Sequence, residues 1–283
     1  MNFLTALLAI ILLEAYGELG AVQRDGWVRR WHRGLEAIEF LARPFVIRLA
    51  LFVAVPVILL HLVLAALSHQ WGLLVFVLEL LVLLYAMGRG NLDTQIALFT
   101  SDLEKDNLRA AFDDATVFDL SHREGVDENI EDLREQIFAS LPYRIFERTF
   151  IVIFWFYLFG APAALAYRLL ALHGDLDFDE TDTDSDQPGL KWLWLMEWLP
   201  VRLLGLTVGL VGNFSYAASA VRKLLFCRST GTAEFLRHAI KGALGDEQAS
   251  RVLTHQTVSE VTLLFGRAMT GWLVVIAILV ILS

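Results

Sequence analysis

Residues 142–172 read PYRIFERTFIVIFWFYLFGAPAALAYRLLAL and contain the clearest membrane span of the chain. Within this stretch, residues 149–167 carry no charged side chain over nineteen positions. At about 1.5 Å of rise per residue, a helix of that length crosses a hydrocarbon core of about 30 Å. Arg168 follows the uncharged stretch directly. We therefore predict a transmembrane helix here, with a kink at Gly160-Ala161-Pro162.

The composition indicates an integral membrane protein. The 283 residues are 56% hydrophobic and 19% charged, and the mean hydropathy is +0.55, which is too apolar for an ordinary soluble domain. The net charge of −9 argues against a nucleic-acid partner. The single cysteine, Cys227, excludes an internal disulfide and a cysteine-based zinc cluster. The composition predicts an all-α polytopic membrane protein.

Five other apolar stretches are candidates for transmembrane helices. Residues 2–16 are short and contain Glu14, so this stretch either crosses with a buried carboxylate or stops near an interface. Residues 71–87 contain Glu79, and only three residues separate them from the preceding stretch, which predicts a tight antiparallel hairpin. We therefore expect five or six transmembrane helices. The remaining stretches are residues 49–67, 199–218 and 261–282.

Amphipathic helices are expected outside the hydrocarbon core. Residues 17–48 are rich in Arg and Trp with apolar side chains at helical spacing, which predicts a helix lying on the membrane surface. Ser101 and Glu104 form a capping box for a helix to about residue 115, and residues 126–141 predict a second amphipathic helix. The chain then divides into transmembrane helices 1–3 with the surface helix (1–87), a cytoplasmic helical region (88–148), transmembrane helices 4–5 with an acidic periplasmic loop (149–218), a second cytoplasmic helical region (219–260) and a C-terminal transmembrane helix (261–283).

The distribution of basic residues predicts the orientation. Residues 17–48, 88–148 and 222–267 hold the Arg and Lys clusters, whereas residues 68–70 and 173–191 hold one Lys and no Arg. Because basic segments stay on the cytoplasmic side, we expect a multi-pass protein of the bacterial inner membrane with both termini outside and Arg168 toward the outer side. The acidic loop that begins at Asp175 matches a calcium-binding EF-hand only in part, so no metal site is expected.

Charged side chains inside spans are costly and often functional. Glu79 has apolar neighbours on both sides, and Arg168 and Arg202 lie toward the same predicted face, where together they would bind an anion. Tyr167, beside Arg168, and Glu197 complete the set of candidate ligand-binding residues. Under the alternative interpretation, the charges near helix ends reach an interface or pair with each other. No catalytic motif, metal cluster or cofactor motif is present.

Three motifs, in this order along the chain, carry a family resemblance. They are FWFYLFG at residues 154–160, the segment from Ala164 to Arg168, and LPVR at residues 199–202. Together with the GRG turn at residues 88–90 and the Trp-led C-terminal span, they make the sequence similar to the AmpE family, within the CobD/CbiB superfamily. The resemblance covers nearly the whole chain. It implies a regulatory inner-membrane protein, a sensor or signal modulator linked to β-lactamase induction and the antibiotic response.

The enzyme branch of that superfamily joins an amino-alcohol to a corrinoid carboxylate, and its polar motifs are absent here. Residues 143–147 read YRIFE in place of an acid-plus-Asn motif, and residues 169–175 read LLALHGD in place of a Thr-Leu-Asp-Ser run. We therefore expect a modulator rather than an enzyme, with no cofactor.

Two alternatives to the regulatory role stay open. One is a membrane-bound amide synthase related to cobalamin biosynthesis. The other is a transporter or binding protein for a cell-wall fragment or lipid-linked anion, with Glu79, Arg168 and Arg202 in its path. The expected partners are the lipid bilayer and a cell-wall-derived or lipid-linked anionic ligand, and a homo-oligomer is left open.

Overall fold

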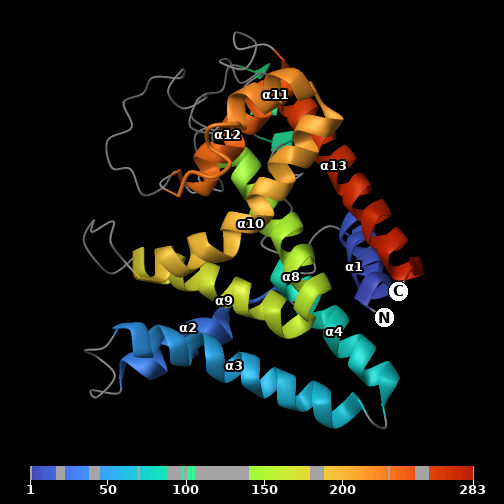
Figure 1. The fold of residues 1–283 in the computed structure, drawn as a ribbon. Helices are drawn as coiled ribbons and strands as arrows, with labels where there is room; N and C mark the ends of the chain where they lie inside the picture. The colour runs from blue at the N-terminus through green and yellow to red at the C-terminus, as the bar shows by residue number, and fades with distance from the viewer. Residues whose placement is uncertain are drawn as a thin grey trace. The chain divides into compact units, whose positions relative to one another are not determined.

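The protein is all-α in the part of the chain that the computed structural model describes, and no strand occurs there (Figure 1). The described residues are 2–16, 23–37, 45–68, 71–87, 97–98, 101–102, 104–105, 140–178, 188–228, 230–245 and 255–282. The elements are α1 (Asn2–Tyr16), α2 (Gly26–Glu36), α3 (Phe45–Ser68), α4 (Gly72–Met87), the π-helical turn η3 (Phe146–Phe150), α8 (Ile151–Phe159), α9 (Ala161–Phe178), α10 (Pro188–Val211), α11 (Phe214–Val221), α12 (Thr232–Leu244) and α13 (His255–Leu282).

Several helices have the length and composition of membrane spans. Three long apolar segments, Val46–Ser68, Gly189–Val211 and Thr257–Leu282, are able to cross a bilayer. Two shorter apolar helices cover Phe3–Leu13 and Gly72–Met87. The prediction of an all-α polytopic membrane protein is confirmed. The predicted helices over residues 101–115 and 126–141 lie largely outside the described residues, as does most of the acidic loop.

The chain forms two compact units. The first, the α9 unit, comprises Met1–Gly90 and Ile151–Glu197, and the second, the α12 unit, comprises Asn91–Phe150 and Trp198–Ser283. The five-part division of the chain stays a prediction.

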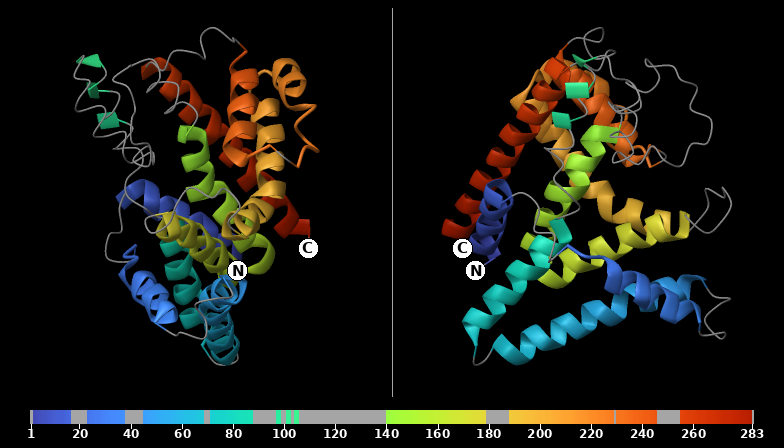
Figure 2. Two further views of the ribbon diagram at one scale, coloured as in Figure 1. Left: turned by 90° about the vertical axis from the view of Figure 1, so that its left-hand side faces the viewer. Right: turned by 180° about the vertical axis from the view of Figure 1, so that it is seen from behind.

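In the α9 unit, α9 packs against α3, α4 and α8 (Figures 1 and 2). The core below α9 is apolar and is built from α2, α3, α4 and α9. Its buried members are Val28, Leu35, Phe52, Tyr85, Leu165, Leu169 and Leu172. Residues 17–48 were expected to form one surface helix, but the described helix in this range covers only Gly26–Glu36 before α3 begins at Phe45. The buried side of α2 packs on protein, through Val28 and Leu35, and not on lipid.

The break at Gly160 separates two helices where the sequence predicted one kinked span. The φ angle of Gly160 is +77°, in the left-handed region that glycine adopts without a Cβ clash. Its N–H donates to the Phe156 carbonyl at 2.8 Å and ends α8, and its carbonyl accepts from the Ala163 N–H at 3.2 Å and starts α9. Pro162 fits in the first turn of α9 because no N–H is needed there. The uncharged stretch 149–167 is therefore not one helix.

In the α12 unit, glycines allow α11 and α12 to pack at very short distance. A Cβ added to Gly242 would lie 2.6 Å from the Ala217 Cα, so no larger residue fits at this crossing. The Asn213 side chain accepts from the Tyr216 N–H and caps α11, while the Asn213 N–H donates to the Ala243 carbonyl at 2.8 Å. Gly245, with a φ angle of +80°, ends α12. These contacts make the α11–α12 pair a tightly built module.

Candidate functional site

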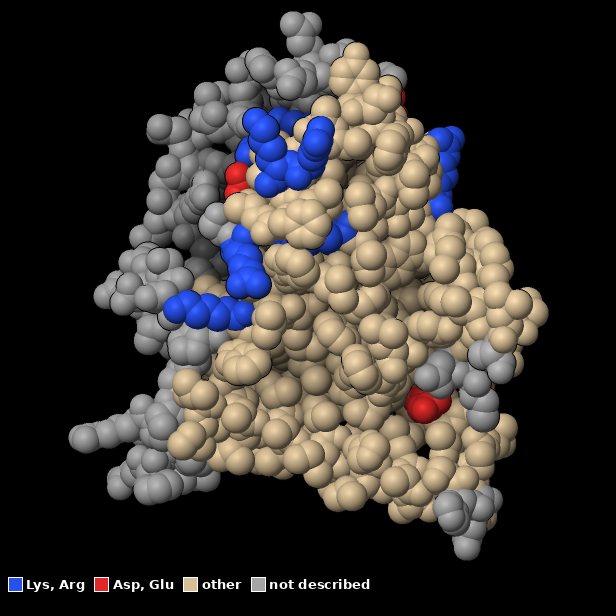
Figure 3. Space-filling model, in the orientation of Figure 1, with Lys and Arg blue, Asp and Glu red and all other residues tan. Residues whose placement is uncertain are grey.

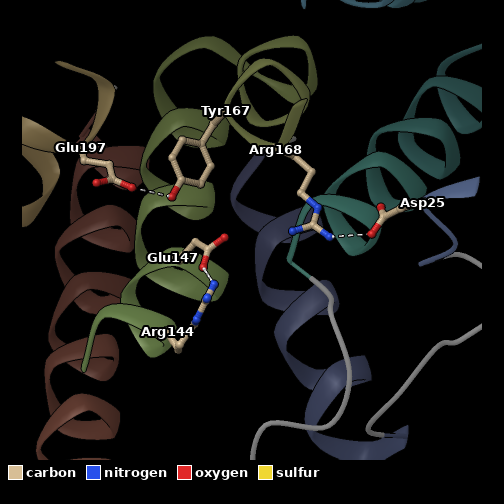
Figure 4. Close-up of polar contacts among 6 residues, drawn as sticks. All are labelled: Asp25, Arg144, Glu147, Tyr167, Arg168 and Glu197. Atoms are coloured by element: carbon tan, nitrogen blue, oxygen red, sulfur yellow. Dashed lines mark hydrogen bonds and ion pairs between the residues drawn. The ribbon is translucent and has the colours of Figure 1, made fainter. Parts of the chain in front are cut away.

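Tyr167 and Arg168 are neighbours in the middle of α9, and both are buried. Figure 4 shows their side chains pointing in different directions, because successive helical residues are about 100° apart. The Tyr167 hydroxyl donates to Oε1 of Glu197 at 3.1 Å. Arg168 Nη2 donates to Oδ2 of Asp25 at 3.3 Å. The sequence motif thus places two polar contacts on different faces of one helix.

Asp25 connects three helices, α2, α4 and α9. It immediately precedes α2, and its second oxygen, Oδ1, accepts from the Tyr85 hydroxyl of α4 at 3.0 Å. A carboxylate at this position also interacts favourably with the positive end of the α2 dipole. Through Asp25, the start of α2 is bonded to both α4 and α9. We call Asp25, Tyr85 and Arg168 the α2 anchor.

The anchor contains a buried ion pair. The side chain of Arg168 is 5% exposed and that of Asp25 is 18% exposed. Within the described residues, Arg168 Nε has no hydrogen-bond partner. Removing two charges from water is costly, and their mutual attraction offsets that cost only while both partners are in place. The docked and undocked arrangements of α2 therefore differ strongly in the free energy that this ion pair contributes.

A second set of ring and ion contacts joins α2 to α9 and α3. His173 follows Arg168 by five residues on α9, and its ring centroid lies 5.3 Å from that of His32 and 5.1 Å from that of Phe52. His32 Nδ1 is 3.6 Å from Oε2 of Glu36, and Arg48 Nη1 on α3 is 3.5 Å from Oε1 of the same carboxylate. The α2 helix is thus held along its length, and not only at its start.

Arg202 lies in the α12 unit, and its guanidinium donates to backbone carbonyls of the same unit. It donates from Nε to the Leu225 carbonyl at 3.3 Å, from Nη2 to the Cys227 carbonyl at 2.9 Å and from Nη1 to the Trp198 carbonyl at 3.3 Å. Its guanidinium carbon is 4.9 Å from the ring centroids of both Trp198 and Phe235. Arg202 therefore anchors the turns that follow α11.

The five predicted site residues are only partly brought together. Tyr167 and Glu197 are hydrogen-bonded, as described above. Arg168 and Arg202 belong to different compact units, and each has its own partners within the chain, so a shared anion site stays a prediction. Glu79 is half-buried on α4, and no ion pair of Glu79 occurs within the described ranges.

One polar pair outside the predicted set of site residues lies at the start of residues 142–172. In the α12 unit, Arg144 Nη1 donates to Oε2 of Glu147 at 2.7 Å, and both side chains are buried (Figure 4). Glu147 lies within η3, and Arg144 lies two residues before η3 begins. Its i, i+3 spacing was visible in the sequence, whereas its burial was not.

Sequence reasoning missed Asp25, Tyr85, His32 and His173. Asp25 carried a local signal, because an acidic residue directly before an amphipathic helix marks an N-terminus. Tyr85 and His173 are polar groups inside apolar helices, and such groups take a hydrogen-bonding or ring partner when buried. What the sequence did not show is that these signals meet at one place.

The ion pair also bears on the predicted orientation. The basic segment that contains Asp25 was assigned to the cytoplasmic side, and Arg168 was assigned toward the outer side. A contact of 3.3 Å places the two residues at the same depth, and the hydrocarbon core is about 30 Å thick. The assignment of Arg168 to the side opposite α2 stays a prediction that this contact disfavours, because the turn at Gly160 allows α9 to fold back on α3 and α4.

The described residues contain no group of three or more His, Cys, Asp and Glu side chains able to hold a metal ion.

Comparison with known proteins identifies the family of the chain. A family model described as regulatory signalling modulator protein AmpE matches residues 1–283, the whole chain. Searches of curated proteins and of solved structures found no match.

Proposed function

The chain belongs to the AmpE family of regulatory signalling modulator proteins and is a membrane protein, and from this premise we propose that it modulates the signal controlling β-lactamase induction. The observation that supports this role is the α2 anchor, in which a buried ion pair ties a basic helix to two apolar helices. A modulator needs an element with two arrangements whose balance a signal can shift. We propose α2 as that element.

The surface of α2 would allow a partner to distinguish the docked arrangement of this helix from the separated one. The side of α2 that faces the core is apolar, while Arg29, Arg30 and Arg33 are exposed on the opposite side. When Asp25 separates from Arg168, the helix loses its bond to α9 and its basic face changes position. A partner that reads this face would then sense the state of the membrane helices.

The location follows from the charge distribution around α2. We propose that the protein lies in the bacterial inner membrane, with the Arg-rich α2 on the cytoplasmic side. Because α9 contacts α2, the inner half of α9 belongs to the same side. A cytoplasmic signal acceptor would therefore have access to α2 directly. A cell-wall-derived anion, the input that we propose, would shift the balance between the two arrangements of α2.

An induction assay tests this function. Cells carrying an inducible β-lactamase and lacking their own copy of this protein would express the wild type, Asp25→Asn or Arg168→Gln, at matched membrane levels. We expect both variants to change β-lactamase activity after exposure to a β-lactam, because each removes the Asp25–Arg168 ion pair and weakens the docking of α2. Glu260→Gln is the matched control, since Glu260 is exposed on α13 and outside the anchor. Equal induction by all four forms would refute the role of the anchor, and equal induction with and without the protein would refute the function.

A further inference from the structure

The α11–α12 module contains a groove that the regulatory role does not use. The groove has a volume of about 680 Å³ and is lined by Tyr216, Ser219 and Ala220 of α11 and by His238, Lys241, Gly242 and Gly245 of α12. On each helix the second and third of these residues lie three and four positions after the first, so they share one face. We propose that this groove binds the phosphate-bearing headgroup of an anionic membrane lipid.

The position of the module in the chain places it at the membrane surface. The apolar segment Gly189–Val211 ends only two residues before α11 begins at Phe214, and another apolar segment, Thr257–Leu282, follows α12. Because only two residues separate α11 from the preceding apolar segment, the module lies at the membrane–water interface. Exposed aromatic side chains, which prefer that region, are present at Phe214, Tyr216 and Phe226, the last being 84% exposed.

The charge of the module fits an anionic surface. Residues 212–245 hold five basic side chains and one carboxylate, Glu234, whereas the whole chain has a net charge of −9. Basic residues near a membrane surface are attracted to anionic lipids. Figure 3 shows most of the blue side chains gathered in the upper part of the view, where Figure 1 draws α11 and α12. The basic residues are Arg222, Lys223, Arg228, Arg237 and Lys241.

The chemistry of the lining is that of a phosphate site. Lys241 supplies an ammonium group, and His238 and Tyr216 supply further N–H and O–H groups, all of which hydrogen-bond phosphate oxygens. The close crossing at Gly242 and the cap at Asn213 hold the two walls in place, so little ordering is needed when a headgroup binds. The exposed aromatic residues beside the groove would contact the glycerol and acyl region of the same lipid.

Lipid binding to the full-length protein in detergent tests the proposal. Native mass spectrometry would measure phosphatidylglycerol and phosphatidylcholine binding to the wild type, and we expect clear preference for phosphatidylglycerol. Lys241→Gln should weaken phosphatidylglycerol binding about tenfold, because it removes a charged hydrogen-bond donor. Lys241→Arg should retain it. Ala220→Phe should also weaken it, because the ring fills the groove without altering charge.

Three results would overturn the proposal. Arg267→Gln is the matched control, since Arg267 is an exposed basic residue of α13 that does not line the groove. An equal loss in Arg267→Gln and Lys241→Gln would mean that general charge, and not the groove, attracts the lipid. Unchanged binding in Ala220→Phe would place the headgroup elsewhere. Displacement of the lipid by glycerol 3-phosphate would assign the groove to a soluble phosphate instead.

Discussion

The buried ion pair between Asp25 and Arg168 gives the sharpest prediction. Asp25→Asn keeps the shape of the side chain but leaves the Arg168 guanidinium, 5% exposed, without its counter-charge. Breaking one side of a buried ion pair costs about 3–5 kcal/mol of the free energy of unfolding. Arg168→Gln should cost less, about 1–3 kcal/mol, because the carboxylate of Asp25 is 18% exposed and still accepts from Tyr85.

The double variant distinguishes an ion pair from two independent contributions. With both charges gone, no uncompensated charge remains, so the loss should be smaller than the sum of the two single losses by about 2 kcal/mol. The assay is reversible unfolding by denaturant in mixed micelles, with all four forms measured at one pH. Arg33→Gln, on the exposed side of α2, is the control and should shift stability by no more than about 0.5 kcal/mol.

The reasoning fails if the two changes are additive. A coupling energy below about 0.5 kcal/mol would show that Asp25 and Arg168 do not stabilise each other, whatever their separation. A double variant that is less stable than the wild type by the full sum of the two single losses would be that result.

Four further predictions follow from single contacts. Gly242→Ala should destabilise the α12 unit by about 1–3 kcal/mol because its Cβ meets Ala217, whereas Gly271→Ala, with open space around it, should not; thermal unfolding compares them. Gly160→Ala should cost about 1–2 kcal/mol in the same assay, because its φ angle of +77° disfavours a Cβ. Arg202→Gln should raise the rate of maleimide labelling at Cys227 about tenfold, since it frees the Cys227 carbonyl; an unchanged rate would contradict the anchoring role. In a Cys227→Ser background, Arg24→Cys and Lys191→Cys should react with an impermeant thiol reagent from the same side of the membrane, and labelling from opposite sides would restore the charge-based orientation.

Hydropathy and helix-breaking residues were sufficient to predict most of the fold. The apolar stretches at residues 49–67 and 71–87 became α3 and α4, because a continuous apolar run specifies a membrane helix through its own composition. The break at Gly160 was found but underestimated. Gly and Pro indicate that a helix bends or breaks. Whether the result is one kinked helix or two separate helices depends on the sign of the Gly160 φ angle, and that sign depends on how α8 and α9 pack.

The candidate site was less predictable because its contacts are distant in sequence. Arg168 and Asp25 are separated by 143 residues, and the charge of Arg168 gives no information about which carboxylate it meets. The partners of Arg202 were not predictable from the sequence either, because they are backbone carbonyls, which every residue possesses. Tyr167 and Glu197 were both named, and their hydrogen bond was found only in the structure.

Three contacts agree on which ends of the neighbouring helices lie level with α9. Arg168 meets Asp25 before α2, Asp25 meets Tyr85 in the last turn of α4, and His173 meets Phe52 near the start of α3. The start of α3 and the end of α4 lie on one face, because the two helices form a hairpin with a short connection.

The contact at Gly174 extends this depth to α10. A Cβ added to Gly174 would lie 3.9 Å from a methyl group of Leu190, so the beginning of α10 lies level with the end of α9. Basic residue counts assign loops to sides on the assumption that every apolar stretch crosses. The α8–α9 pair turns at Gly160, and Arg168 contacts the residue directly before the basic helix from which it was predicted to be separated, so this pair need not meet that assumption.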